Sequence, residues 1–145
     1  MLNLNSNMKK MLLTVAIFVA VSHPMVSNTV QSVTGAVLPE GTQLSSGNCA
    51  TTLGSVVLAV LFALVTYLVF KKQDNKMTEQ QHRKNAVHSG LLFFLVSNRN
   101  TYELTQRLVG GFVQTFDGMC PTTMGTVAHG FALIGLRELL KKVAN

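Results

Sequence analysis

The sequence predicts an all-α fold: an integral membrane protein built from two tandem helical hairpins, about four helices in all, related by a pseudo-twofold axis. Three observations lead to this prediction: a shortage of charged residues, one long stretch without charge, and an internal repeat. Hydrophobic residues make up 48% of the 145 residues and charged residues 12%, whereas a soluble domain usually carries about 25% charged residues. Because a soluble surface needs charge, this composition favours a membrane protein.

The longest apolar stretch runs from Leu53 to Phe70, contains no charged residue and ends at Lys71-Lys72. A run of roughly 18 or more apolar residues matches the hydrocarbon thickness of a bilayer. The alternative is a buried core helix, which is less favoured because such helices are usually shorter and amphipathic. We therefore expect a transmembrane helix over this stretch.

The N-terminal segment has the layout of a secretory signal. Lys9-Lys10 would be its charged region, Met11 to Val21 its short apolar region, and cleavage would fall near Ser27. A later part of the chain repeats the same segment, however, and a signal peptide is not duplicated together with the mature protein. We expect the segment to stay in the chain as a helix.

The internal repeat appears when the first half is compared with the second at two offsets. The second offset is shorter because the first copy has a longer loop around Pro39 to Ser46, and both copies end at a Lys-Lys pair. Coincidence among small and apolar residues is the alternative, but the order of the matches is preserved. The matches at the first offset include Phe18 with Phe93, Gln31 with Gln106 and Gly35 with Gly110, and those at the second include Cys49 with Cys120 and Gly54 with Gly125.

The repeat divides the chain into an N-terminal tail at 1–8, a first helical hairpin at 9–72, a basic connector at 73–84 and a second helical hairpin at 85–145. In each hairpin an apolar run is followed by a half-polar stretch that ends in glycine, then by a turn with the cysteine, then by a second apolar helix. That helix begins at a threonine pair whose hydroxyl can cap it and ends in lysines. Because charges lie close to its apolar runs, we expect the second hairpin to be only partly immersed.

Lysine and arginine predict the topology. The N-terminal end carries two of these residues, Lys9 and Lys10, and the stretch 71–84 carries five, whereas 28–52 has none and 98–121 has two. Because positive residues concentrate on the cytoplasmic side, both termini and the connector should lie on that side and both cysteine turns on the other. Two copies in the same orientation imply an axis along the membrane normal, which could bring Cys49 and Cys120 together as a disulfide or leave them as two thiols.

Several residues have predicted structural roles. Four glycines at paired positions are expected to allow close helix packing in lipid, and Pro24, after His23, is expected to kink a helix. These helix-packing glycines are Gly35, Gly54, Gly110 and Gly125.

Patterns typical of catalysis or ligand binding are missing, so we predict no enzyme, no cofactor and no metal site. No pair of histidines has the spacing of a helical zinc site with an acid between them. His88 and His129 lie in the two apolar helices of the second copy and could face each other, although such histidines more often join helices through polar contacts. Basic residues flank apolar runs rather than forming a stripe with aromatic residues, which disfavours nucleic-acid binding.

The run FVAVSHPMVSNTVQSVTGAVL, followed by the cysteine turn and VVLAVLFALVTYL, resembles the small hydrophobic membrane proteins of large icosahedral DNA viruses, such as algal viruses and their giant relatives. The second copy departs from this pattern, since Ser97-Asn98-Arg99 replaces Ser22-His23-Pro24. The resemblance implies a component of the virion's internal membrane, or of a host membrane during assembly, beneath capsid or minor capsid proteins.

Three functions then remain as expectations: a structural protein that anchors capsid proteins to the bilayer, a pore or transporter of the viroporin kind, and a cellular membrane scaffold subunit. The expected partners are the bilayer, capsid proteins and further copies of the chain. Arg99, Glu103 and Arg107 would share one face of a helix and form the face that contacts a partner. The alternative is a solvated face with no partner.

Overall fold

The structure is a computed structural model that describes residues 5–39, 41–47, 49–74, 76–118 and 120–143. Residues 1–4 of the predicted tail and residues 144–145 of the second hairpin lie outside the described part. The described residues form six α-helices and one hairpin of two-residue strands, so the prediction of an all-α fold is confirmed. The predicted number of about four helices is too low, because the half-polar stretch of each copy forms a helix of its own. In chain order the elements are α1 (Ser6–Val21), α2 (Pro24–Thr34), β1 (Ser45–Ser46), β2 (Cys49–Ala50), α3 (Thr52–Gln73), α4 (Glu79–Ser97), α5 (Arg99–Val109) and α6 (Thr123–Val143).

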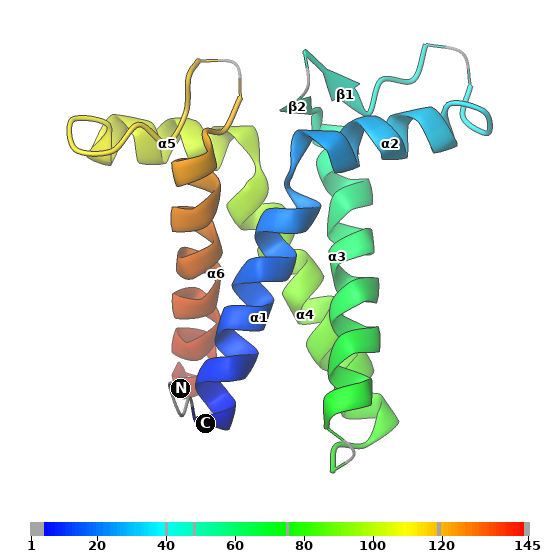
Figure 1. The fold of residues 1–145 in the computed structure, drawn as a ribbon, viewed down its shortest axis with the longest axis vertical. Coiled ribbons are helices and arrows are strands. Elements are labelled where there is room, and N and C mark those ends of the chain that lie inside the picture. Colours follow the sequence, from blue (N-terminus) through cyan, green and yellow to red (C-terminus); the bar gives the residue numbers. More distant parts are fainter. Residues whose placement is uncertain (1–4, 40, 48, 75, 119, 144–145) are drawn as a thin grey trace.

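Four helices stand upright and two lie across one end of them (Figure 1). Helices α1 and α4 cross in the middle, with α3 and α6 on opposite sides, while α2 and α5 extend outward in opposite directions. The end that carries α2, α5 and the turns 35–51 and 110–122 is named the cap. The other end, named the base, carries both chain ends and the turn between α3 and α4, which is the arrangement that the hairpin topology requires.

The internal repeat is visible in the order and registration of the helices. Helices α2 and α5 begin at Pro24 and Arg99, which match at the first offset of the repeat, and α3 and α6 begin at Thr52 and Thr123, which match at the second. Burial follows the same correspondence, because paired positions supply buried core side chains in both copies. These pairs are Phe18 with Phe93, Val21 with Val96, and Phe62 with Leu133.

Three phenylalanines from three upright helices form the centre of the core. The ring of Phe93 lies 5.0 Å from that of Phe18 and 4.7 Å from that of Phe62, and the rings of Phe18 and Phe62 are 6.2 Å apart. All three side chains are fully buried, as is Leu133 of α6. Aromatic rings at such distances attract one another beyond the burial of their area, so the cluster joins the two copies where α1 and α4 cross.

Close approach between upright helices uses glycines that differ from the four predicted. A Cβ atom on Gly90 of α4 would lie 3.0 Å from the carbonyl oxygen of Ala59 on α3, and a Cβ atom on Gly130 of α6 would lie 3.2 Å from Val15 of α1. Gly90 of α4 corresponds to Val15 of α1, and Ala59 of α3 corresponds to Gly130 of α6. The glycine therefore lies on α4 in one interface and on α6, the other side of the contact, in the equivalent interface. Either arrangement lets the two helices approach closely.

The predicted connector is shorter than expected. Helix α3 continues to Gln73 and α4 already begins at Glu79, so most of 73–84 is helical. Thr78 caps α4, since its hydroxyl accepts from the backbone N–H of Gln81 while the Gln81 side chain accepts from the backbone N–H of Thr78. This capping box fixes the start of α4 well before its apolar stretch, which lies at the C-terminal end of the helix.

One helix of the described part, α3, is long and apolar enough to cross a membrane, and α1 with α2 qualifies only as a pair bent by 57°. Core helices of soluble proteins can meet the same criteria. Exposure of apolar side chains on the upright helices therefore distinguishes a membrane protein from a soluble one better than helix length does.

Candidate functional site: the cap

The cap begins where two upright helices stop. Between α1 and α2, His23 caps the start of α2: its Nδ1 atom accepts from the backbone N–H of Met25 at 3.3 Å, and Pro24 is the first residue of the helix. In the second copy the Oδ1 atom of Asn98 accepts from the backbone N–H of Asn100 at 3.1 Å. Pro24 therefore lies at a break between two helices rather than inside one kinked helix. A capping side chain makes the same turn in the second copy without proline.

A glutamine in each lateral helix holds the turn that follows it. The Oε1 atom of Gln31 accepts from the backbone N–H groups of Leu44 and Ser45, the latter at 3.2 Å. The Oε1 atom of Gln106 likewise accepts from the backbone N–H groups of Thr115 and Phe116, at 2.6 Å and 3.0 Å. The two glutamines match at the first offset of the repeat, and the N–H groups that they bind match at the second. In each copy the glutamine therefore joins the segment aligned at the first offset to the segment aligned at the second.

The return into α3 and α6 is made in the same way in both copies. Thr51 donates from its hydroxyl to the carbonyl oxygen of Gln43 at 2.8 Å and accepts from the backbone N–H of Gly54 at 3.1 Å. Thr122 does the same with Gln114, at 2.6 Å, and with Gly125, at 3.0 Å. Each threonine therefore caps its helix and ties it to the preceding turn.

The four predicted packing glycines all lie in the cap. A Cβ atom on Gly54 would overlap the carbonyl oxygen of Leu44, and one on Gly125 would overlap that of Thr115. A Cβ atom on Gly35 would press on the carbonyl oxygen of Gln31, and one on Gly110 would overlap Gln106. Their predicted role in helix–helix packing is corrected: these glycines admit turn backbone or the glutamine of their own helix.

Cys49 and Cys120 are joined as a disulfide, with Cα atoms 5.6 Å apart. The bond links the two turns across the pseudo-twofold axis. Glycines with positive φ, Gly47 at 57° and Gly118 at 90°, lie at equivalent places just before the two cysteines. A cross-link between cysteines separated by 71 positions along the chain restricts the unfolded chain by about 4 kcal/mol in the chain-entropy description.

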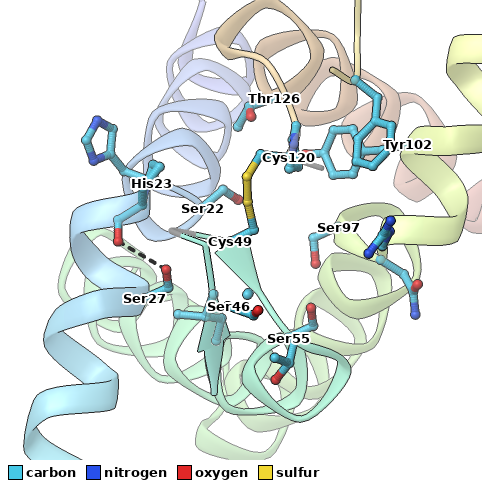
Figure 2. Close-up of a pocket in the computed structure, with 18 of the residues that line it drawn as sticks. Ser22, His23, Ser27, Ser46, Cys49, Ser55, Ser97, Tyr102, Cys120 and Thr126 are labelled. Atoms are coloured by element: carbon cyan, nitrogen blue, oxygen red, sulfur yellow. Dashed lines mark hydrogen bonds between the residues drawn. A yellow bond between two sulfur atoms is a disulfide. The ribbon is translucent and has the colours of Figure 1, made fainter. Parts of the chain in front are cut away.

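A cavity of about 550 Å³ lies beneath the disulfide. Hydroxyl groups at paired positions surround it (Figure 2), among them Ser22 with Ser97 and Ser55 with Thr126. The Ser22 and Ser97 hydroxyl oxygens are buried and find no hydrogen-bond partner among the described residues. A lining of this kind suits water or a neutral polar group, and the cavity ends at Leu58 and Phe93, against the aromatic cluster.

Of the two alternatives for His88 and His129, the one in which they face each other is wrong. His88 is exposed, whereas His129 is buried and joins three helices. Its Nδ1 atom lies 2.8 Å from the carbonyl oxygen of Val96 and its Nε2 atom 3.0 Å from the Thr105 hydroxyl. Its ring stacks on that of Tyr102 of α5, with the ring centroids 3.9 Å apart. Burial of the Tyr102 hydroxyl raises the pKa of that group to about 12. His129 thus makes the polar contact between helices, and no three metal-binding side chains cluster within the described residues.

The predicted partner-contact face occurs in the second copy only. Arg107 pairs with Glu103 at 3.2 Å, and Arg99 donates to the carbonyl oxygen of Gly118 at 3.3 Å while its guanidinium lies over the Phe116 ring. Two of the charges therefore pair with each other and the third supports the cysteine turn. The equivalent positions in α2 carry no charge, since they are Pro24, Asn28 and Ser32.

The lateral helices have an apolar side turned away from the turns they hold. Residues two apart on a helix point about 200° apart, so Leu104 and Leu108 point away from Gln106. Leu108 is 74% exposed, and Val33 at the equivalent place in α2 is 68% exposed. Leu104 is also two residues from Tyr102, which is buried against His129, so it points away from the bundle as well as from the turn.

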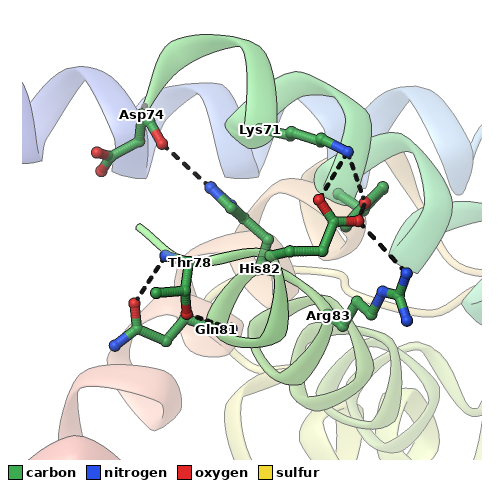
Figure 3. A network of polar contacts seen from close by, with 8 residues as sticks. Lys71, Asp74, Thr78, Gln81, His82 and Arg83 are labelled. Carbon is green, nitrogen blue, oxygen red and sulfur yellow. Dashed lines mark hydrogen bonds and ion pairs between the residues drawn. The ribbon is translucent and has the colours of Figure 1, made fainter. Parts of the chain in front are cut away.

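The base is held by ion pairs (Figure 3). Glu79 binds Lys71 at 2.9 Å and Arg83 at 3.4 Å and accepts from the Tyr67 hydroxyl. These contacts lower the pKa of Glu79 to about 2, with the Tyr67 hydrogen bond as the largest cause and Lys71 next. Lys10 of α1 pairs with Asp74 at 2.7 Å, so the ion pairs connect α1, α3 and α4.

Sequence reasoning aligned Gln31 with Gln106 but assigned them no function. The repeat itself indicated a role for them, because a glutamine at the same position in two mostly apolar copies suggests a shared polar contact. No protein-family model, no curated protein and no solved structure matches the chain. The site therefore has to be interpreted from its own geometry.

We expect Gly54→Ala and Gly125→Ala each to destabilise the protein by about 1–3 kcal/mol, because the added methyl group overlaps backbone that cannot move aside cheaply. Thermal unfolding in detergent measures the loss. Gly135→Ala is the matched control, since Gly135 is helical and has open space around it. Equal stability of all three variants would remove the close contact from the explanation.

We expect Gln31→Ala and Gln106→Ala each to cost about 1–3 kcal/mol, because two backbone N–H groups lose their acceptor. Glutamate at 106 keeps an acceptor for both groups, so Gln106→Glu should lose less than Gln106→Ala. At position 31 glutamate also loses the bond from Nε2 to the carbonyl oxygen of Thr42, so Gln31→Glu should be the more damaging of the two glutamate variants. Gln80→Ala, on the exposed surface, is the control, and unfolding by denaturant is the measurement.

The Glu79 ion pairs predict an acid dependence. The folded pKa lies below the ordinary value of 4.5, at about 2, so the stabilisation is complete above pH 4.5 and is lost as the pH falls towards 2. The difference in unfolding temperature between the protein and Glu79→Gln should therefore shrink across this window. A difference that stays constant from pH 5 to pH 2 would contradict the role of Glu79.

Proposed function

We propose that the protein is an integral membrane, non-catalytic structural protein that holds an overlying protein layer to the bilayer through its cap. The observation that carries the proposal is a belt of exposed apolar side chains on the upright helices. It lies between a cap that carries the disulfide and the charges of α5 and a base that carries ion pairs. This arrangement matches the succession of interface, hydrocarbon and interface in a bilayer.

The belt is clearest on α3 and α4. Large apolar side chains at every fourth residue are exposed there, in positions where a soluble protein would present polar residues. Only 33% of the most apolar stretch of α3 is buried within the molecule. A soluble monomer rarely exposes a continuous apolar surface of this kind, so a hydrocarbon environment is the simplest cover. The side chains are Val56, Val60, Leu64 and Leu68 on α3 and Val87, Leu91 and Leu95 on α4.

The two ends differ in the way that membrane orientation requires. The base carries most of the lysines and arginines, including Lys71, Lys72 and Arg83, which favours the cytoplasmic side. The cap carries the disulfide, which favours an oxidising compartment. Both arguments give the same orientation from independent residues.

The lateral helices support a position of the cap at the membrane surface. Leu104 and Leu108 on α5, and Val33 on α2, are exposed on the side of the helix that lies opposite the glutamine. A helix with opposed apolar and polar sides lies in the plane of the interface. In that position the cysteine turns and the charged face of α5 point away from the bilayer, where a protein layer would meet them.

A scaffold fits the interior better than a pore does. The cavity below the disulfide stops at the cluster of Phe18, Phe62 and Phe93, and Leu133 is fully buried beside the same core. A continuous path would require these side chains to separate. The resemblance to membrane proteins of large icosahedral DNA viruses supplies the proposed setting, a virion internal membrane, and the proposed partner, a capsid or minor capsid protein.

We expect the full-length protein to remain in the membrane pellet after alkaline carbonate extraction, with tags at the two ends and at position 76 accessible from one side only. The double variant Glu103→Ala/Arg107→Ala should also remain in the pellet but should enter assembled particles less efficiently. This variant leaves Arg99 on its turn, so the fold of the cap is preserved. Gln80→Ala on the base side of the molecule is the matched control.

Release of the protein into the carbonate supernatant would overturn the membrane assignment. Normal incorporation of the double variant into particles would overturn the anchoring role of α5. Ion conductance of the purified protein in planar bilayers would favour a pore instead.

A further inference from the structure

An apolar groove of about 810 Å³ runs along the outside of α3 and α4. Its lining is apolar apart from Tyr67 and Arg83, which lie at the base end. The groove exists because small residues line the contact between the two helices: Ala59 and Ala63 on α3, with Ala86 and Gly90 on α4.

On the equivalent surface of α6 and α1, three of the four small residues have larger counterparts, whereas Ala59 corresponds to the smaller Gly130. Two leucines that line the groove, Leu64 and Leu91, correspond to the smaller Gly135 and Ala16. Ile134 corresponds to Ala63, Met11 to Ala86 and Val15 to Gly90, while Phe131 corresponds to Val60 on the rim of the groove. Phe131 is 54% exposed, and Met11 and Leu12 are exposed beside it. Divergence of the two copies has therefore left a depression on one face and a ridge, formed by Met11, Leu12 and Phe131, on the equivalent face.

We propose that the ridge of one copy of the protein docks in the groove of the next, so that copies associate in rows within the membrane; this inference rests on the membrane setting proposed above. Apolar side chains that protrude at one face match a depression lined by alanine and glycine at the other. Small residues of this kind let helices approach closely in lipid, where packing drives association.

The symmetry of the molecule sets the geometry of such a row. A pseudo-twofold axis along the membrane normal keeps equivalent residues at the same depth, so Phe131 lies at the level of Val60. The axis also sets the two faces on opposite sides of the molecule, with α3 and α6 outermost (Figure 1). A neighbour related by a sideways shift therefore brings ridge to groove, and a heterologous contact that does not close produces a row.

Charge at the base end agrees with this contact. Arg83 lies at the end of the groove, and Glu138 occupies on α6 the position that Tyr67 occupies on α3. In a row the ridge of one copy would bring Glu138 to the level of Arg83 of its neighbour. Opposite charges at the two ends favour this pairing over groove against groove, in which Arg83 would meet Arg83.

Cysteine cross-linking in native membranes tests the proposal. Val60→Cys and Leu12→Cys are made separately in the full chain, each with its own epitope tag and with the native disulfide kept, and are expressed singly and together. Both positions are exposed on the surface, so neither variant disturbs the core. We expect a dimer that carries both tags when the two variants are mixed and treated with a short bifunctional thiol reagent, and far less dimer from either variant alone. Leu108→Cys, equally exposed but on the cap, is the control for random collision.

The outcomes separate the possibilities. Dimers from Val60→Cys alone as efficient as in the mixture would show a symmetric contact and overturn the row. No dimer above the Leu108→Cys level would show that lipid alone covers the groove and would also overturn it.

A second pair of variants tests the ridge itself. When a Leu12→Cys chain is mixed with a Val60→Cys chain, adding Phe131→Ala to the Leu12→Cys chain should reduce the mixed dimer several-fold, because that chain supplies the ridge. Adding Phe131→Ala to the Val60→Cys chain should leave the mixed dimer unchanged, and an equal loss from both placements would contradict the row. Carbonate extraction of the same membranes shows separately whether the proposed membrane function holds.

Discussion

The bond from each lateral glutamine to the turn that follows it is the interaction on which the cap depends. Gln31 and Gln106 each supply one oxygen to two backbone N–H groups, and a buried N–H group without a partner costs about 1–3 kcal/mol. The bond fixes the distance between lateral helix and turn. That distance determines where the chain re-enters the bundle, which is why Gly54 and Gly125 must lack a side chain.

The two copies share a backbone plan but differ in their chemistry. The second copy places His129 where the first has Leu58, and so replaces apolar packing with polar bonds to α4 and α5. It also carries the charges of α5, whereas α2 is uncharged. The first copy supplies apolar α3, the helix best suited to cross a bilayer. Duplication thus provides the frame, and substitution at equivalent positions provides two different faces.

Much of the fold followed from pattern. The two offsets of the repeat placed the helix starts, the paired cysteines and the opposite ends of the hairpins, because a duplicated chain folds its copies alike. The functions of the glycines did not follow, since the sequence cannot tell whether the atoms nearest Gly54 belong to a helix or to a turn. The alternative in which His88 faces His129 is wrong for a related reason: membership of an apolar helix does not say which side of it a residue occupies. The expectation that such a histidine joins helices through polar contacts holds for His129.

The sequence by itself determined the helical class, the duplication and the separation of apolar stretches from basic clusters, because these depend on composition and periodicity along the chain. Only the tertiary structure decided that Gln31 and Gln106 hold the turns, that Gly90 and Gly130 lie at the close helix contacts, and that small residues leave a groove along α3 and α4. These features depend on contacts between segments that are distant in the sequence, and the packing of α1 and α4 around three phenylalanines determines those contacts.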